Sequence, residues 1–243
     1  MRKYGLIGYP LSHSFSKTYF AEKFRLGDIT DAVYENFSIP SIDELEVVLR
    51  NNPDLRGLNV TIPYKQAVID KLHNLDHLPL NACNCIKIEG GKLTGFNTDI
   101  IGFEKSLSPM LQSSHRKALV LGKGGAAMAV NYVLDKLGII HTTVSRNPDG
   151  VSTIGYQDLT EKIIRENQLI INTTPVGMFP NVESCPDIPY SYIGPQHYLF
   201  DLIYNPAKTL FLQKGEKRGA LTHNGSDMLV IQAEESWRIW NDE

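Results

Sequence analysis

A glycine-rich turn separates a short apolar segment from a helical pattern near the middle of the chain. The apolar segment covers residues 118–121, the turn reads Gly122-Lys-Gly-Gly-Ala-Ala127, and the helical pattern continues to about residue 137. A strand, a glycine turn and a helix in this order form a dinucleotide-binding unit, because glycines let backbone N–H groups approach a pyrophosphate at the helix N-terminus. The pattern predicts a Rossmann-like domain whose cofactor contacts include Gly122, Gly124, Gly125 and Ala126.

The end of the next strand carries an arginine where many dinucleotide-binding proteins carry an acid. The strand is expected over residues 141–144, and it is followed by Ser145 and Arg146, with no acid before Asp149. An acid here holds the ribose hydroxyls of NAD, whereas a guanidinium suits the 2′-phosphate of NADP in charge and shape. An arginine in a surface loop is the alternative. We predict NADP as the cofactor, with Ser145 and Arg146 at its adenosine end.

The first hundred residues alternate between strand and helix patterns and end in a hairpin. Strands are expected over residues 3–8, 32–37 and 58–62, and helices after Ser16, from 41 to 49 and from 64 to 72. The hairpin covers residues 85–96 and has Gly90-Gly91 at its turn. This segment is predicted to be an α/β domain of its own.

Polar side chains collect around the strand of residues 58–62. Asn59 and Thr61 are two residues apart and share a face, Pro63 ends the strand, and Lys65 follows at its carboxyl end, where open α/β sheets bind ligands. Ser14 and Ser16 add two hydroxyls after the first strand. Each residue alone has an ordinary explanation, such as Ser16 capping a helix. Together they predict a site for a substrate rich in hydroxyl groups.

The remaining segments continue the alternation. Two interpretations of this junction are open and can hold together: Asp99 or Thr98 caps a helix over residues 100–111, and Asp99 is a carboxylate that partners Lys65. Strands are expected over 169–172, 198–203 and 220–222, and a helix over 209–218. The last helix opens at Ser226 or Asp227, and Met228, Gln232 and Ser236 form a row next to its apolar stripe, so Gln232 borders the packed face.

The composition excludes several classes of protein. The chain has 243 residues, 42% hydrophobic and 21% charged, with a net charge of −3 and no basic run, which argues against a nucleic-acid or anionic-membrane partner. No apolar run is long enough to span a bilayer. The three cysteines fit neither an even disulfide set nor a zinc spacing, so we expect no metal and a reducing, cytoplasmic location.

Several separated motifs together resemble the shikimate dehydrogenase family along the whole chain. They are Pro10-Leu-Ser-His-Ser-Phe-Ser16, Asn59-Val-Thr-Ile-Pro-Tyr-Lys65, Asn97-Thr-Asp99, Gly122-Lys-Gly-Gly-Ala126, Asn172-Thr-Thr-Pro-Val-Gly-Met178, Asp201-Leu-Ile-Tyr204, Asn224-Gly225 and Gln232-Ala233. The resemblance implies NADPH-dependent, reversible reduction of 3-dehydroshikimate to shikimate, in chorismate and aromatic amino-acid biosynthesis.

The resemblance also implies roles for individual residues. Lys65 and Asp99 would form the catalytic pair. The substrate would be held by Ser14, Ser16, Asn59, Thr61, Asn84, Tyr204 and Gln232, and Leu202 and Gly225 would join the cofactor contacts. The family usually has a second basic residue after the first in the NADP loop; here that place falls near Gly150, which leaves Arg146 nearly alone.

The implied architecture is two α/β domains with a cleft between them that closes on substrate. The last helix would return to the first domain, giving a substrate domain of residues 1–99 plus 225–243 and an NADP domain of residues 100–224. Three alternatives stay open at this point: a quinate/shikimate dehydrogenase with relaxed specificity, a non-catalytic NADP sensor, and a methyltransferase. Either a monomer or a homodimer fits the sequence.

Overall fold

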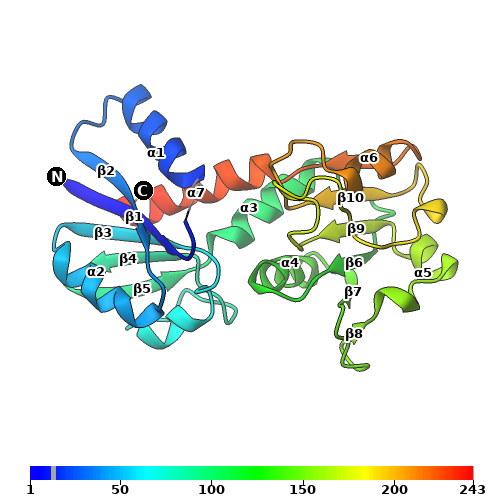
Figure 1. The fold of residues 1–243 in the computed structure, drawn as a ribbon, viewed down its shortest axis with the longest axis horizontal. Coiled ribbons are helices and arrows are strands. Elements are labelled where there is room, and N and C mark those ends of the chain that lie inside the picture. The colour runs from blue at the N-terminus through cyan, green and yellow to red at the C-terminus, as the bar shows by residue number, and fades with distance from the viewer. Residues whose placement is uncertain (12–14, 243) are drawn as a thin grey trace. The chain divides into compact units, whose positions relative to one another are not determined.

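The computed structural model describes residues 1–11 and 15–242, and these form two compact units. The first unit comprises the described parts of Met1–Thr98 and Ala233–Glu243, and the second is Asp99–Gln232. The chain leaves the first unit at the start of one helix and returns to it within the last one. Each unit contains one sheet, so the prediction of two α/β domains is confirmed (Figure 1).

The first unit is built on a mixed sheet in the order β2-β1-β3-β4-β5. Its strands are β1 (Arg2–Gly8), β2 (Ala32–Ser38), β3 (Leu55–Val60), β4 (Cys85–Glu89) and β5 (Lys92–Phe96). The first three strands pair in parallel, whereas β4 pairs antiparallel with β3 and with β5. Gly90 and Gly91 both have positive φ, 56° and 77°, which a tight hairpin turn of this kind requires. The predicted hairpin is confirmed.

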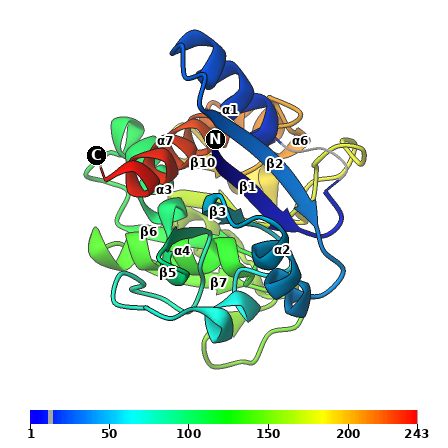
Figure 2. The ribbon, with the colours of Figure 1, turned by 90° about the vertical axis from the view of Figure 1, so that its left-hand side faces the viewer.

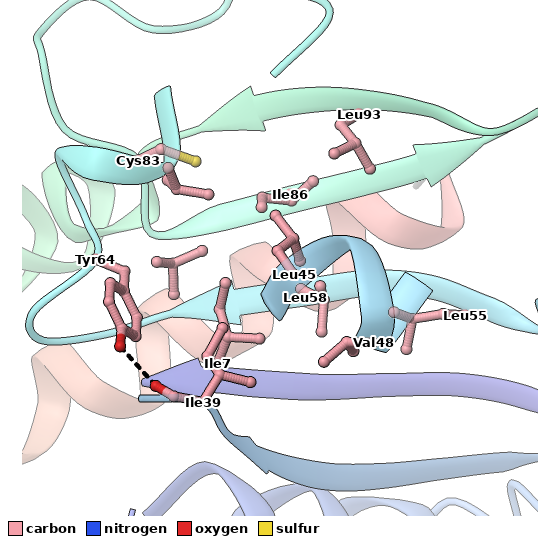
Figure 3. Packing of buried hydrophobic residues seen from close by; sticks show 12 residues of the cluster. Ile7, Ile39, Leu45, Val48, Leu55, Leu58, Tyr64, Cys83, Ile86 and Leu93 are labelled. Atoms are coloured by element: carbon pink, nitrogen blue, oxygen red, sulfur yellow. Dashed lines mark hydrogen bonds between the residues drawn. The ribbon is translucent and has the colours of Figure 1, made fainter. Parts of the chain in front are cut away.

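Helices cover both faces of this sheet. On one face, α1 (Phe15–Leu26) and the C-terminal part of α7 (Ser226–Asn241) pack on Tyr4, Leu6 and Tyr34 through an aromatic cluster that includes Trp237 and Trp240. On the other face, α2 (Leu45–Asn51) covers Ile7, Leu58 and Val60. Figure 2 shows the two faces from the side of this unit, and Figure 3 shows the second core, closed at one end by a Tyr64 hydroxyl that donates to the Ile39 carbonyl at 2.5 Å.

The second unit is built on a six-stranded parallel sheet in the order β8-β7-β6-β9-β10-β11. Its strands are β6 (Lys117–Leu121), β7 (Ile140–Val144), β8 (Thr153–Ile154), β9 (Leu169–Asn172), β10 (Tyr198–Asp201) and β11 (Leu221–His223). This order, numbered within the unit, is 3-2-1-4-5-6, the strand order of the Rossmann fold. The Rossmann-like domain predicted from the glycine turn is confirmed.

Four further helices belong mainly to this unit: α3 (Thr98–Leu107), α4 (Gly125–Lys136), α5 (Glu161–Glu166) and α6 (Leu210–Glu216). Successive residues of a strand face opposite sides of the sheet. Accordingly, Leu199 of β10 packs in the core with Phe211 of α6, whereas its neighbour Phe200 meets Phe103 of α3 edge-on at 5.2 Å. The strand order brings the carboxyl ends of β6 and β9 side by side, which is where Rossmann sheets bind their cofactor.

Several predicted boundaries were wrong. Helix α1 begins at Phe15 and α3 at Thr98, so Ser16, Thr98 and Asp99 lie inside the first turns of these helices. Strand β3 runs from Leu55 to Val60 and not over residues 58–62. Gly57, which is a poor strand former, lies inside it and packs against Trp240, a contact that the local sequence pattern does not reveal.

Other local predictions also need correction. The helix expected after Pro63 is only a 3₁₀ segment, Ala67–Lys71, and short 3₁₀ segments also replace the ends predicted for two other helices, at Ile42–Glu44 and Ser108–Met110. Strand β8 and helix α5 were not predicted, because they are too short to carry a clear period.

Candidate active site

Asn59 lies at the centre of a buried polar network in the first unit. Its side chain is 4% exposed. Its Oδ1 accepts from the Tyr34 hydroxyl at 2.8 Å, and its Nδ2 donates to Ser236 Oγ at 2.8 Å and to the Asn84 carbonyl at 3.3 Å. Both ends of the amide are therefore held in one orientation by β2, by α7 and by the residue that precedes β4.

Asn84 belongs to the same network. Its Oδ1 accepts from the Thr98 backbone N–H at 2.6 Å, and its Nδ2 donates to Thr98 Oγ1 at 3.0 Å. Thr98 Oγ1 lies 3.3 Å from Ser236 Oγ, so Ser236 and Thr98 connect the two asparagines. Neither connecting residue was predicted as part of the site; the signal for Ser236 was its place in the row of α7 that also contains Gln232.

Ser16 lies beside this network. Burial raises the pKa of the Tyr34 hydroxyl, and a hydrogen bond with Ser16 opposes that rise. Because the same hydroxyl donates to Asn59, two residues predicted to bind substrate share one neighbour. Ser14, the other predicted serine, lies outside the described residues.

Thr61 and Lys65 follow the carboxyl end of β3. The Thr61 N–H donates to the Ile7 carbonyl at 3.0 Å, and a Cβ on Gly8 would lie only 2.4 Å from the Thr61 methyl group, so Gly8 is needed for this close approach. The carbonyl of Lys65 accepts from the Cys83 N–H at 2.7 Å, which fixes its backbone beside β4, and both side chains are half-buried.

The other predicted substrate and catalytic residues belong to the second unit. Asp99 is 7% exposed in the first turn of α3. Helix α7 crosses α3 at Gly102, where a Cβ would lie 3.2 Å from Cβ of Gln232 and 2.8 Å from the Met228 carbonyl. The Gln232 amide donates to the Leu229 carbonyl at 2.9 Å, and Tyr204 is 36% exposed after β10.

The glycine turn has the backbone geometry of a nucleotide-binding loop. Gly122 follows β6 with φ +107°, and a Cβ there would lie 2.8 Å from Thr173 Oγ1 and 2.9 Å from the Thr174 methyl group. Only glycine fits this position without strain. A Cβ on Gly124 would meet nothing within 4 Å, so open space lies directly before helix α4.

The N-terminus of α4 is suited to an anion. Gly124 caps the helix without a side-chain hydrogen bond, and the first turn, which includes Gly125 and Ala126, has no acidic residue. The first N–H groups of a helix carry a partial positive charge and have no partner within the helix. The residues therefore fit a pyrophosphate, as expected from the glycine turn.

Leu202 and Gly225, the two predicted cofactor residues outside the glycine turn and the loop after β7, lie against each other. Gly225 donates its N–H to the Ile203 carbonyl at 3.2 Å, and a Cβ on Gly225 would lie 2.1 Å from the Leu202 carbonyl. The Leu202 N–H in turn donates to the Asn172 carbonyl at 3.0 Å. This close contact joins the carboxyl ends of β9 and β10 to the start of α7.

A buried carboxylate secures the same edge of the sheet. Asp201 is fully buried and accepts from Thr209 Oγ1 at 2.5 Å, from Asn172 Nδ2 at 3.0 Å and from the Ile203 N–H at 3.1 Å. Burial raises the pKa of Asp201 to about 6, against the effect of these hydrogen bonds. The Asp201 carboxylate therefore links the end of β10 to Asn172 at the end of β9 and to Thr209 before α6.

Arg146 is exposed at the end of β7, next to a buried Ser145. Ser145 Oγ accepts from the Asn147 N–H at 3.2 Å, which turns the chain at this point. Asp149, the first acidic residue after β7, accepts hydrogen bonds at its carboxylate from the N–H groups of residues 151, 152 and 153. The acid that could have held ribose hydroxyls is therefore directed into its own turn.

In the described part of the chain, no cluster of three or more histidine, cysteine or acidic residues could hold a metal ion. Within the same residues, no helix is both long enough and apolar enough to cross a membrane.

The strand order and the helix after Gly122, whose N-terminus has no side-chain cap, define an α/β protein of the dinucleotide-binding class, extended by a second α/β unit. The family model of the shikimate dehydrogenase substrate binding domain matches residues 6–86 of the sequence, within the first unit. The shikimate dehydrogenase (NADP(+)) of Caldicellulosiruptor saccharolyticus is 37% identical, over the whole chain and 93% of that relative. The chain belongs to the shikimate dehydrogenase family.

Solved structures of shikimate dehydrogenases are similar to this fold over the full length of the chain. Shikimate dehydrogenase from Aquifex aeolicus is 32% identical with a TM-score of 0.87, and the match covers the whole chain and 93% of that protein. The enzyme from Thermus thermophilus, solved in complex with NADP(H) and shikimate, is 27% identical with a TM-score of 0.87, covering the whole chain and 94% of that protein.

Proposed function

We propose that this chain is an oxidoreductase that uses NADPH to reduce 3-dehydroshikimate reversibly to shikimate, a step in chorismate and aromatic amino-acid biosynthesis. The observation that carries the proposal is the full-length identity of 37% with a relative named shikimate dehydrogenase (NADP(+)). The local geometry supports it, because the glycine turn and Arg146 fit NADP in the second unit.

The cofactor would be held along the carboxyl edge of the second sheet. Backbone N–H groups at Gly124, Gly125 and Ala126 would bind the pyrophosphate, beside Gly122. Ser145 and Arg146 would bind the adenosine ribose and its 2′-phosphate. Leu202 and Gly225, which lie against each other, would contact the cofactor at the ends of β10 and β11.

Lys65 and Asp99 are proposed as the catalytic pair. When bound, NADPH supplies the hydride that reduces the ketone. The Lys65 ammonium would stabilise the negative charge that develops on the carbonyl oxygen and would donate the proton to it. In the oxidation direction, neutral Lys65 would accept the hydroxyl proton at Nζ, and Asp99 would orient the lysine or share the proton.

The substrate's hydroxyl and carboxylate groups would be held by polar residues, which are Ser14, Ser16, Asn59, Thr61, Asn84, Tyr204 and Gln232. Asn59 and Asn84 are already oriented by Tyr34, Ser236 and Thr98. A side chain that is fixed before the substrate arrives loses little conformational entropy on binding. The network is thus proposed to pre-organise the substrate site.

Replacing Lys65 by alanine tests the catalytic role. Turnover of shikimate should fall by a general acid–base factor of about 100-fold or more, while NADPH binding persists. Lys92→Ala, which removes an exposed lysine of the same unit, is the matched control and should leave turnover unchanged. Near-normal turnover in the Lys65 variant would refute the assignment.

Two alternatives are separated by substrate and cofactor. A quinate/shikimate dehydrogenase would oxidise quinate at a comparable rate or accept NAD, so both polyols should be tested with both cofactors. A non-catalytic sensor would bind NADP without turnover. We also propose a cytoplasmic location, which rests on three cysteines that form no disulfide, and either a monomer or a homodimer.

A further inference from the structure

The loop after β7 carries positive charge that its own acid does not neutralise. Asp149 directs its carboxylate inward, where Ser152 Oγ donates to Oδ2 at 2.5 Å and backbone N–H groups donate to Oδ1. These hydrogen bonds hold the pKa of Asp149 well below its usual range. Because its oxygens are engaged in the turn, Arg146 remains the exposed charge at the strand end.

A second cation reaches this loop from the glycine turn. Lys123 is exposed between Gly122 and Gly124, and its Nζ donates to the Asn147 carbonyl at 3.0 Å. Asn147 directly follows Arg146, so the ammonium group of Lys123 lies at the same end of β7 as residue Arg146. Among the residues that the structure describes, no carboxylate forms an ion pair with either side chain.

We propose that Lys123 is a specificity-determining residue that binds the 2′-phosphate of NADP together with Arg146. The inference rests on the proposed use of NADP and deepens it. A phosphate monoester carries a charge of about −1.5 to −2 at neutral pH and offers three acceptor oxygens. Lys123 and Arg146 together supply a matching charge.

The chemistry of the two side chains supports a shared site. A lysine ammonium has three donors, and the Asn147 carbonyl takes one of them, which leaves two donors on this exposed side chain. A dianion bound by both side chains would be attracted by each positive charge.

A purely structural role is the competing explanation, because the Lys123–Asn147 bond also ties the glycine turn to the loop. Lys123→Gln separates the two roles, since an amide can still donate to the Asn147 carbonyl but has no charge. Lys162→Gln is the matched control, because it removes one charge from a side chain of the same unit that is 83% exposed.

The test is calorimetric binding of two fragments by the full chain: adenosine 2′,5′-bisphosphate and adenosine 5′-monophosphate, which differ only in the 2′-phosphate. Lys123→Gln should weaken binding of the bisphosphate by about tenfold, the usual loss for one charge-assisted hydrogen bond. Binding of the monophosphate should change by less than about twofold, and Lys162→Gln should change neither. Lys123→Arg should retain the preference for the bisphosphate.

If Lys123→Gln weakens binding of both fragments equally, Lys123 only ties the glycine turn to the loop. If binding of both fragments is unchanged, Lys123 does not contact the ligand. Either result overturns the inference. Both leave the proposed function intact if the unaltered protein prefers the bisphosphate. If the unaltered protein binds the two fragments equally, the NADP assignment and this inference fail together.

Discussion

Ser236→Ala is expected to destabilise the first unit through the network that orients Asn59. The serine is fully buried, and its Oγ accepts from Asn59 Nδ2 at 2.8 Å and lies 3.3 Å from Thr98 Oγ1. Removing it leaves Nδ2 of Asn59 with only its longer bond, of 3.3 Å, to the Asn84 carbonyl. A buried donor left without a good partner costs about 1–3 kcal/mol.

Urea unfolding followed by tryptophan fluorescence measures this cost. Both tryptophans of the chain, Trp237 and Trp240, lie in the first unit, so their signal reports on that unit. With a urea dependence of about 2 kcal/mol per molar, the midpoint should fall by about 0.5–1.5 M. Ser38→Ala, an exposed serine of the same unit, is the control. A Ser236 variant with the midpoint of the Ser38 variant would refute the reasoning.

Three further outcomes are expected. Burial raises the pKa of Asp201 to about 6, so the native protein should lose up to about 3 kcal/mol of stability relative to Asp201→Asn as the pH rises from about 4 to 7. Parallel denaturant titrations of the two proteins across this pH range measure the difference in stability. A difference that stays constant with pH would contradict the expectation. Gly57→Ala should cost about 1–3 kcal/mol of stability in the same fluorescence assay, because the new Cβ would lie 2.2 Å from Nε1 of Trp240. An unchanged urea midpoint would show that helix α7 moves aside freely and would contradict this cost. Gly122→Ala should weaken NADP and NAD alike in a binding titration, because the Cβ would lie 2.8 Å from Thr173 Oγ1 and the positive φ disfavours alanine; native affinity for both would contradict the assigned loop geometry.

Features that depend on local chemistry could be predicted from the sequence. The Gly90-Gly91 hairpin and the strand–turn–helix unit after β6 follow from glycine placement and hydrophobic period, and both are present. Arg146 was likewise placed at the end of β7 by counting along one strand.

Features that depend on contacts between distant segments could not be predicted. Ser236 meets Asn59 across 177 residues, because α7 returns to the sheet of the first unit. Lys123 reaches the loop at Asn147 only because β6 and β7 are neighbours in the sheet, so the sequence left Arg146 alone there. Neither a hydrophobic period nor a turn motif specifies such pairs.

The central claim is tested most directly by the rate of nicotinamide reduction when the purified protein oxidises shikimate, in parallel runs with NADP and NAD. We predict strong turnover with NADP and little with NAD, in agreement with a cofactor site that has Arg146 and no available acid at the end of β7. Equal turnover with both would keep the dehydrogenase and contradict the cofactor assignment. No turnover with either, in a folded protein that binds NADP, would contradict the proposed activity itself.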